Sequence, residues 1–315
     1  MPVMRALVID SFGGPEVLRL AEVPVPVAGP GRVRIRVEAA TVHPVDLATR
    51  AGVLAEAGLM AGRGRTGLGW DVAGVVEETG PGVTGFAPGD RVIGMNDRLD
   101  VPLGTQAEYV VLDAHAVAPA PVGLAPQAAA TLPLAGLTAL QALAALDLPA
   151  GETLLVTGAA GAVGGYAVQL AAARRLRVVA TARAGDEALV RGLGAELFVS
   201  ADAPRLGEAV RELVPGGVAG ALDGAVLGAA ALDAVRTGGA FAALVAGGAP
   251  YPLRGVRVVP VWVRADPSDL AHLSKLASAG TLTPRVADTL PLSHAAEAHH
   301  RRAEPGLRGS LVLLP

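Results

Sequence analysis

Short runs rich in β-branched residues, separated by glycine and proline turns, recur through the first 118 positions of the chain. The run Arg32–Val37 alternates arginine with valine or isoleucine, which is the period-two pattern of a strand with one face in water. We predict further strands at Arg5–Ile9, Val72–Val76, Asp90–Gly94 and Ala107–Val111. Strands this short and closely spaced indicate a compact β-barrel-like domain.

The pattern changes after this region. Residues Ala125–Ala145 are apolar and typical of helix, and strands then alternate with helices to about residue 263. The strands are expected at Leu154–Val156, Val178–Ala180, Leu197–Val199, Gly220–Leu222, Ala240–Val245 and Val256–Val263. This alternation predicts an α/β fold with a doubly wound parallel sheet. We place the boundaries at 1–118 for the barrel domain, completed by a strand-like tail within 286–315, and 119–285 for the parallel-sheet domain.

A glycine turn follows the first strand of the expected parallel sheet. The spacing Gly158-x-x-Gly161-x-x-Gly164 lets the backbone turn tightly, lets amides approach a pyrophosphate and lets the following helix pack close to the sheet. We expect Gly158, Ala160, Gly161, Ala162 and Val163 to hold a dinucleotide there, with Thr138, Thr181, Val245 and Gly247 as further cofactor contacts. A strand-to-helix turn without a ligand is the alternative interpretation.

The end of the second strand bears on the choice of cofactor. An NAD enzyme usually carries an acidic residue there for the ribose hydroxyl, whereas this chain has Thr181-Ala182-Arg183 and no acid until Asp186. A guanidinium suits the 2′-phosphate of NADPH, so Arg183 favours NADPH over NADH. A solvated surface arginine is the alternative.

Composition excludes several classes of function. The chain has no cysteine, which rules out disulfides, thiolate zinc sites and a cysteine nucleophile. Its net charge is −3 and only 3% of its residues are aromatic, whereas nucleic-acid binders typically carry a basic surface, so we expect no nucleic-acid partner. The histidines His294, His299 and His300 lie in a segment typical of an exposed helix, so we expect no metal there.

Two segments bear on the cellular compartment in which the protein is expected. The N-terminal run Met1–Val8 leads into a strand and lacks the pattern of a signal peptide. The apolar run Ala125–Leu148 is interrupted by proline, threonine, glutamine and aspartate, which favours a buried helical region over a membrane span. We therefore expect a cytoplasmic protein.

Several blocks resemble the zinc-independent quinone oxidoreductases of the medium-chain dehydrogenase/reductase superfamily, which include zeta-crystallin. These blocks are Gly69–Val76, Gly80–Val83, Phe86, Gly89–Val92, Gly104–Val110, Leu132–Ala139, the glycine turn, Gly280–Pro284 and Pro291–Ala298. The resemblance implies a GroES-like substrate domain, a Rossmann domain that binds NADPH, and hydride transfer to a quinone or an α,β-unsaturated carbonyl compound. It also implies a homodimer and a small-molecule substrate. Trp70-Asp71 stands where the related zinc alcohol dehydrogenases carry a His-Glu pair, so the resemblance implies no zinc.

One departure concerns the expected substrate cleft. Many relatives have an Asn-Pro-x-Asp motif that lines the cleft, and here the run is His43-Pro44-Val45-Asp46. His43 either donates a proton or hydrogen bond to the substrate, or fills the structural place of the asparagine. Asp46 either orients His43 or the cofactor ribose, or caps the following helix. Apolar cleft walls are expected from Trp70, Leu134 and Trp262, each of which is otherwise ordinary core.

These observations lead to one preferred function and two alternatives. The preferred function is an NADPH-dependent oxidoreductase for a quinone or enone. The alternatives are a specialised secondary-metabolite reductase or cyclase, and a non-catalytic regulator that binds NADPH.

Overall fold

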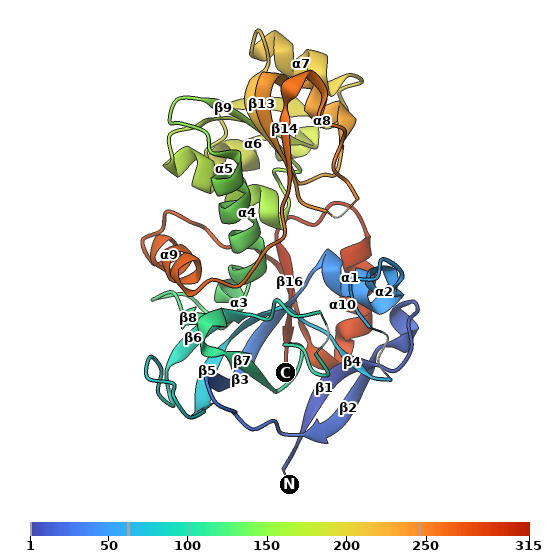
Figure 1. Ribbon diagram of the computed structural model, residues 1–315, viewed down its shortest axis with the longest axis vertical. Helices are drawn as coiled ribbons and strands as arrows, with labels where there is room; N and C mark the ends of the chain where they lie inside the picture. The colour runs from blue at the N-terminus through green and yellow to red at the C-terminus, as the bar shows by residue number, and fades with distance from the viewer. Residues whose placement is uncertain (1, 62–63, 100, 246) are drawn as a thin grey trace. The chain divides into compact units, whose positions relative to one another are not determined.

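The computed structural model describes residues 2–61, 64–99, 101–245 and 247–315 (Figure 1). The chain forms two compact units, Met1–Leu134 with Arg264–Pro315, and Ala135–Val263. Residues 119–134 and 264–285 thus lie in the first unit, although the sequence places them with the parallel sheet. Local packing explains this: α3 (Pro126–Ala129) contacts β3 and β5, and Ser274 of α9 (Pro267–Ser278) donates a hydrogen bond to the Pro119 carbonyl at 2.8 Å.

The first unit is built on two sheets. The smaller has the order β2-β1-β4 and the larger the order β15-β16-β3-β5-β6-β8, with β7 also paired to β3. The strands are β1 (Val3–Ile9), β2 (Arg19–Pro24), β3 (Arg32–Val42), β4 (Thr66–Gly67), β5 (Asp71–Thr79), β6 (Arg91–Met95), β7 (Tyr109–Asp113), β8 (Val117–Pro119), β15 (Val286–Pro291) and β16 (Ser310–Leu314). The helical segments are η1 (Pro15–Val17), α1 (Pro44–Ala51), α2 (Val53–Glu56), η2 (Ala114–Ala116), α3, α9, η5 (Leu292–His294) and α10 (Ala295–Ala303).

The alternation in β3 is confirmed by its burial. Val33, Ile35 and Val37 are buried in the core of the larger sheet, while Arg32 and Arg36 are exposed and Arg34 is half-buried. Arg34 pairs with Glu77 at 3.0 Å and with Glu78. The C-terminal strand β16 joins this sheet by antiparallel pairing with the end of β3, where Leu311 lies opposite Val42.

The second unit is a six-stranded sheet with the order β11-β10-β9-β12-β13-β14, and every pair in it is parallel. The strands are β9 (Thr153–Thr157), β10 (Arg177–Ala182), β11 (Leu197–Ser200), β12 (Val218–Asp223), β13 (Val235–Ala243) and β14 (Arg257–Pro260). The helical segments are α4 (Pro133–Leu146, which begins in the first unit), α5 (Ala162–Ala173), η3 (Ala184–Asp186), α6 (Glu187–Gly192), α7 (Leu206–Leu213), α8 (Ala229–Asp233) and η4 (Leu253–Gly255). This confirms the predicted doubly wound sheet.

The apolar region around α3 and α4 is the one part of the described chain long and apolar enough to cross a membrane. Most of the segment Pro126–Leu146 is buried within the protein, as the core helix of a folded domain would be. Its composition therefore reflects core packing.

Candidate active site

The glycine turn connects β9 to α5. Gly158 has φ +63°, in the left-handed region that favours glycine. The turn is tied to the end of β10 because the Ala159 amide donates to the Thr181 carbonyl at 2.9 Å. Gly161 is the N-cap of α5, and its amide donates to the Gly158 carbonyl at 2.9 Å.

The third glycine of the motif has a steric role. A Cβ atom on Gly164 would lie 2.2 Å from the Gly158 carbonyl oxygen and 2.9 Å from the Ala159 Cα, so only glycine fits there. The first turn of α5 therefore packs directly on the glycine turn. Gly161, Ala162 and Val163, at the positive end of the helix, are half-buried and thus reachable from solvent. These features fit a dinucleotide pyrophosphate.

The end of β10 presents a free cation. Arg183 is exposed, and its guanidinium forms no hydrogen bond or ion pair with any residue that the structure describes. Thr181, by contrast, is buried, and its backbone carbonyl accepts the hydrogen bond from the Ala159 amide of the glycine turn. An exposed guanidinium without a carboxylate partner is available to an anionic ligand.

The other expected cofactor contacts differ in accessibility. Thr138 is buried in α4, whereas Val245, just after β13, is exposed. Gly247 has φ +78°, and Ala246 between them lies outside the described residues. Among the expected cleft walls, Trp262 is 61% exposed, Trp70 is half-buried and Leu134 is buried.

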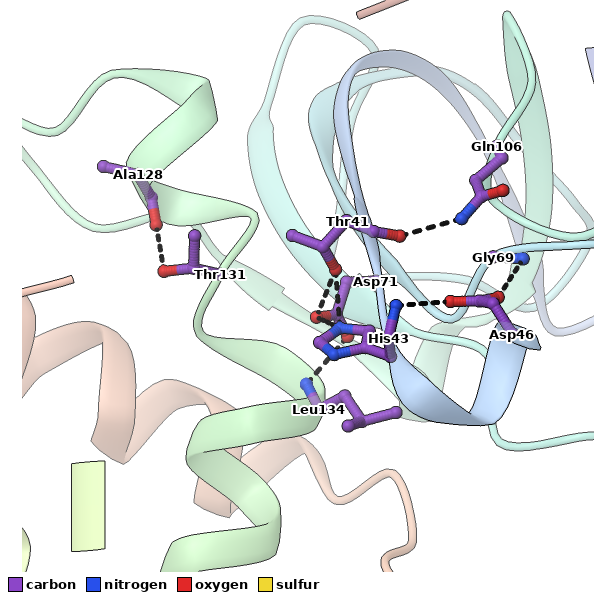
Figure 2. A network of polar contacts seen from close by, with 9 residues as sticks. All are labelled: Thr41, His43, Asp46, Gly69, Asp71, Gln106, Ala128, Thr131 and Leu134. Atoms are coloured by element: carbon purple, nitrogen blue, oxygen red, sulfur yellow. Dashed lines mark hydrogen bonds and ion pairs between the residues drawn. The ribbon is translucent and has the colours of Figure 1, made fainter. Parts of the chain in front are cut away.

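A buried polar cluster in the first unit surrounds His43 (Figure 2). His43 follows β3, and its Nε2 lies 2.6 Å from Asp71 Oδ2 and 2.6 Å from Thr41 Oγ1. The Thr41 hydroxyl also donates to Asp71 Oδ2 at 2.8 Å, and the Leu134 amide donates to Asp71 Oδ1 at 2.7 Å. His43 is only 3% exposed and Asp71 is fully buried.

Asp46 holds the backbone around this cluster. Its Oδ2 accepts the His43 amide at 2.8 Å and its Oδ1 accepts the Gly69 amide at 2.8 Å. His43 is the N-cap of α1, so Asp46 caps this helix and also fixes the loop that precedes Trp70 and Asp71. The structure thus brings together His43, Asp46 and the backbone of Leu134.

Burial and charge shift both titratable groups of the α1 N-terminus. Burial raises the pKa of Asp46 to about 6, against the pull of His43 and of the two amides. Burial of the His43 ring opposes its charged form, but the Asp71 carboxylate outweighs this effect and raises the pKa of His43 above its usual value. The His43 ring therefore holds its proton to higher pH than a free imidazole does, because the Asp71 carboxylate lies beside it.

Sequence reasoning missed two members of this cluster. Thr41 gave no signal, because a threonine near the end of a strand is ordinary. Asp71 stood in the Gly69–Val76 block, but its role depends on Leu134 and His43, which are distant in the sequence.

One expectation about α10 was wrong. His299 is fully buried rather than exposed, because α10 packs one face, including Ala295, Ala298 and His299, into the first unit. Arg50 Nη1 lies 3.4 Å from His299 Nδ1. Burial, reinforced by the charge of Arg50, lowers the pKa of His299 to about 3, so the ring is neutral.

Comparisons with known proteins agree with this architecture. Residues 29–122 match the family described as "Alcohol dehydrogenase GroES-like domain", and residues 193–313 match "Zinc-binding dehydrogenase". A mycobacterial protein, Rv1454c, solved in complex with NADPH, is 30% identical, with 99% of this chain and 100% of that chain covered and a TM-score of 0.86. The quinone oxidoreductase of Coxiella burnetii is 29% identical, with full coverage of both chains and a TM-score of 0.87.

Curated relatives match over part of their length. The 2-methylene-furan-3-one reductase of Solanum lycopersicum is 36% identical over 203 residues, which are 62% of this chain and 52% of that protein. The chain spans 65% or less of the length of the curated relatives that it matches first.

A GroES-like barrel and a parallel sheet with a glycine turn together define a two-domain oxidoreductase fold. The chain belongs to the medium-chain dehydrogenase/reductase superfamily, and quinone oxidoreductases are among its relatives.

Proposed function

We propose that this chain is an NADPH-dependent oxidoreductase that reduces a quinone or an α,β-unsaturated carbonyl compound without zinc. The observation that carries the proposal is the glycine turn, whose fit to a dinucleotide depends on Gly158 and Gly164. The relatives named for quinone oxidoreduction, for enone reduction and for an NADPH complex support the same chemistry.

The residues of the second unit would hold the cofactor. Gly161, Ala162 and Val163 would bind the pyrophosphate at the N-terminus of α5, and Arg183 would pair with the 2′-phosphate. Val245 and Gly247 follow a strand of the same sheet and would lie on the nicotinamide side. NADPH, when bound, supplies the hydride for the reduction.

Zinc independence rests on the available donors. The chain has no cysteine, and within the described residues no group of three or more histidine and acidic side chains is arranged to hold a metal ion. Asp71 stands where the related zinc alcohol dehydrogenases carry the glutamate of their His-Glu pair, but its two oxygens already accept hydrogen bonds from Leu134, Thr41 and His43. This donor set does not fit a catalytic zinc site.

His43 and Asp46 are assigned positioning roles in this proposal. His43 is buried with Nε2 directed to Asp71, so its ring orders the cluster rather than meeting the substrate. Asp46 holds the loop that carries Trp70. Trp70, Leu134 and Trp262 remain proposed apolar contacts for the substrate. A homodimer and a cytoplasmic location are part of the same proposal.

A turnover panel tests the proposed function. Purified protein is mixed with NADPH and with quinones or enones in turn, before and after treatment with a zinc chelator. We expect substrate-dependent NADPH oxidation that the chelator leaves unchanged. Loss of activity with the chelator would contradict zinc independence. Tight NADPH binding without turnover of any quinone or enone would favour the non-catalytic regulator.

A further inference from the structure

Two buried polar side chains meet at the carboxyl edge of the parallel sheet, beside the glycine turn. Thr157 is the last residue of β9 and Asp223 the last of β12, and they lie opposite each other in the parallel pair. Both are almost fully buried. The Thr157 hydroxyl donates to Asp223 Oδ1 at 2.6 Å, a short bond between a hydroxyl and a carboxylate.

The pair also holds the turn that follows β12. Thr157 Oγ1 accepts the Ala225 amide at 3.0 Å. Asp223 accepts the Leu227 amide through Oδ1 at 3.1 Å and the Gly228 amide through Oδ2 at 2.8 Å. Three backbone amides of one short turn therefore donate hydrogen bonds to these two side chains.

The turn is strained at its centre. Val226 has φ +58°, a conformation that β-branched residues rarely adopt, and its side chain is exposed. Such a conformation persists only where the surroundings impose it. The amide bonds from Ala225, Leu227 and Gly228 to Thr157 and Asp223 flank Val226 on both sides and hold this backbone in place.

The strained turn packs against the glycine turn, backbone to backbone. A Cβ atom on Gly158 would lie 3.2 Å from the Ala225 nitrogen and 3.2 Å from the Gly224 carbonyl carbon. A Cβ on Gly224 would lie 2.7 Å from the Thr157 carbonyl oxygen. A Cβ at either glycine would thus contact the backbone of the other turn, so the two turns lie close together and the position of the 224–228 turn bears on that of Gly158.

We infer that Thr157 and Asp223 are a positioning pair for the dinucleotide site, which sets cofactor affinity by fixing the 224–228 turn against Gly158. Neither residue need touch the cofactor. The inference rests on the proposed binding of NADPH. A purely structural pair would instead stabilise the sheet edge without any effect on cofactor affinity.

Fluorescence titration with NADPH, together with thermal unfolding, separates these two roles. Thr157→Val keeps the shape of the side chain and removes both of its hydrogen bonds, whereas Thr157→Ser keeps the hydroxyl. The matched control is Val210→Ala, which removes buried volume from α7 in the same unit. We expect Thr157→Val to raise the Kd for NADPH about tenfold or more, since bonds to a buried carboxylate are lost, and Thr157→Ser to stay near wild type.

The control and the kinetics complete the test. Val210→Ala should lower the Tm and leave the Kd for NADPH unchanged. For Thr157→Val, the KM for NADPH should rise while kcat at saturating NADPH changes by less than about twofold, because the pair acts on binding. If Thr157→Val does not fold, Asp223→Asn replaces it, since the amide turns an N–H toward the Gly228 N–H and should weaken NADPH binding in the same direction.

The outcomes distinguish the inference from the proposed function. Wild-type protein that binds neither NADPH nor NADH overturns both. Wild-type protein that binds NADPH, with Thr157→Val or Asp223→Asn binding equally well, overturns the positioning pair alone.

Discussion

Substitution of Gly164 by alanine tests the close packing of α5 on the glycine turn. The added methyl group would lie 2.2 Å from the Gly158 oxygen, 2.7 Å from the Gly158 carbonyl carbon and 2.9 Å from the Ala159 Cα. All three atoms belong to the backbone, so no change of rotamer relieves the clash. The helix or the turn has to move.

The size of the effect follows from this geometry. Ordinary contact begins near 3.4 Å, so a separation of 2.2 Å requires a shift of 3.4 − 2.2 = 1.2 Å. Overpacking of this kind costs up to about 3 kcal/mol, and the helix preference for alanine over glycine offsets about 1 kcal/mol, which leaves about 2 kcal/mol of destabilisation. The amides of the first turn of α5 move by a similar distance, so NADPH affinity should fall about tenfold or more.

Gly192→Ala is the matched control. Gly192 also lies in a helix, α6, but an added Cβ there meets nothing within 4 Å. This variant should be as stable as wild type or more stable by up to about 1 kcal/mol, with unchanged NADPH affinity. Urea unfolding and NADPH titration of both variants make the comparison. A Gly164→Ala protein that gains stability as Gly192→Ala does, and binds NADPH normally, would refute the argument.

Three predictions concern the His43 cluster. His43→Asn should change kcat with a quinone and saturating NADPH by less than about threefold between about pH 6 and 8, and a large loss with an altered pH profile would instead identify a proton donor. The pKa of Asp46 is about 6 in the folded state against an ordinary 3.8, so Asp46 stays protonated to higher pH in the folded protein than in the unfolded chain. The free energy of unfolding should therefore fall by roughly 3 kcal/mol as pH rises from about 4 to above 6. The raised pKa of His43 extends this fall to higher pH. In urea unfolding, the free energy of unfolding of Asp46→Asn should depend less on pH between about pH 4 and 6 than that of wild type; the same pH dependence in both proteins would contradict the raised pKa of Asp46. Asp71→Ala removes the hydrogen-bond acceptor of the Leu134 amide, the Thr41 hydroxyl and the His43 ring, and should lower the free energy of unfolding in urea by about 3–5 kcal/mol. A loss below about 1 kcal/mol would contradict the network.

The fold was predictable because its signals are local. The alternation in Arg32–Val37 reports one buried face, and the strand, glycine spacing and helix around Gly158 lie within a dozen residues. Each pattern expresses a constraint that neighbouring residues satisfy together. Arg183 was also a local signal, since its position depends only on where β10 ends.

The polar clusters were not predictable, because their partners are distant along the chain. His43 meets Asp71 from 28 residues away, and Thr157 meets Asp223 from 66 residues away. No periodicity reports such pairs, which depend on strand order. The burial of His299 did leave a signal, because Ala295, Ala298 and His299 have the spacing of one helix face, but the charged neighbours favoured an exposed helix.

Cofactor binding is the central claim, and a fluorescence titration of wild-type protein and Arg183→Ala with NADPH and NADH tests it most directly. We predict that wild type binds NADPH more tightly than NADH, and that Arg183→Ala loses about tenfold in NADPH affinity with little change for NADH. Equal affinity for the two cofactors in both proteins would contradict the role of Arg183. Absence of binding to either cofactor would contradict the account of the glycine turn and the reductase function built on it.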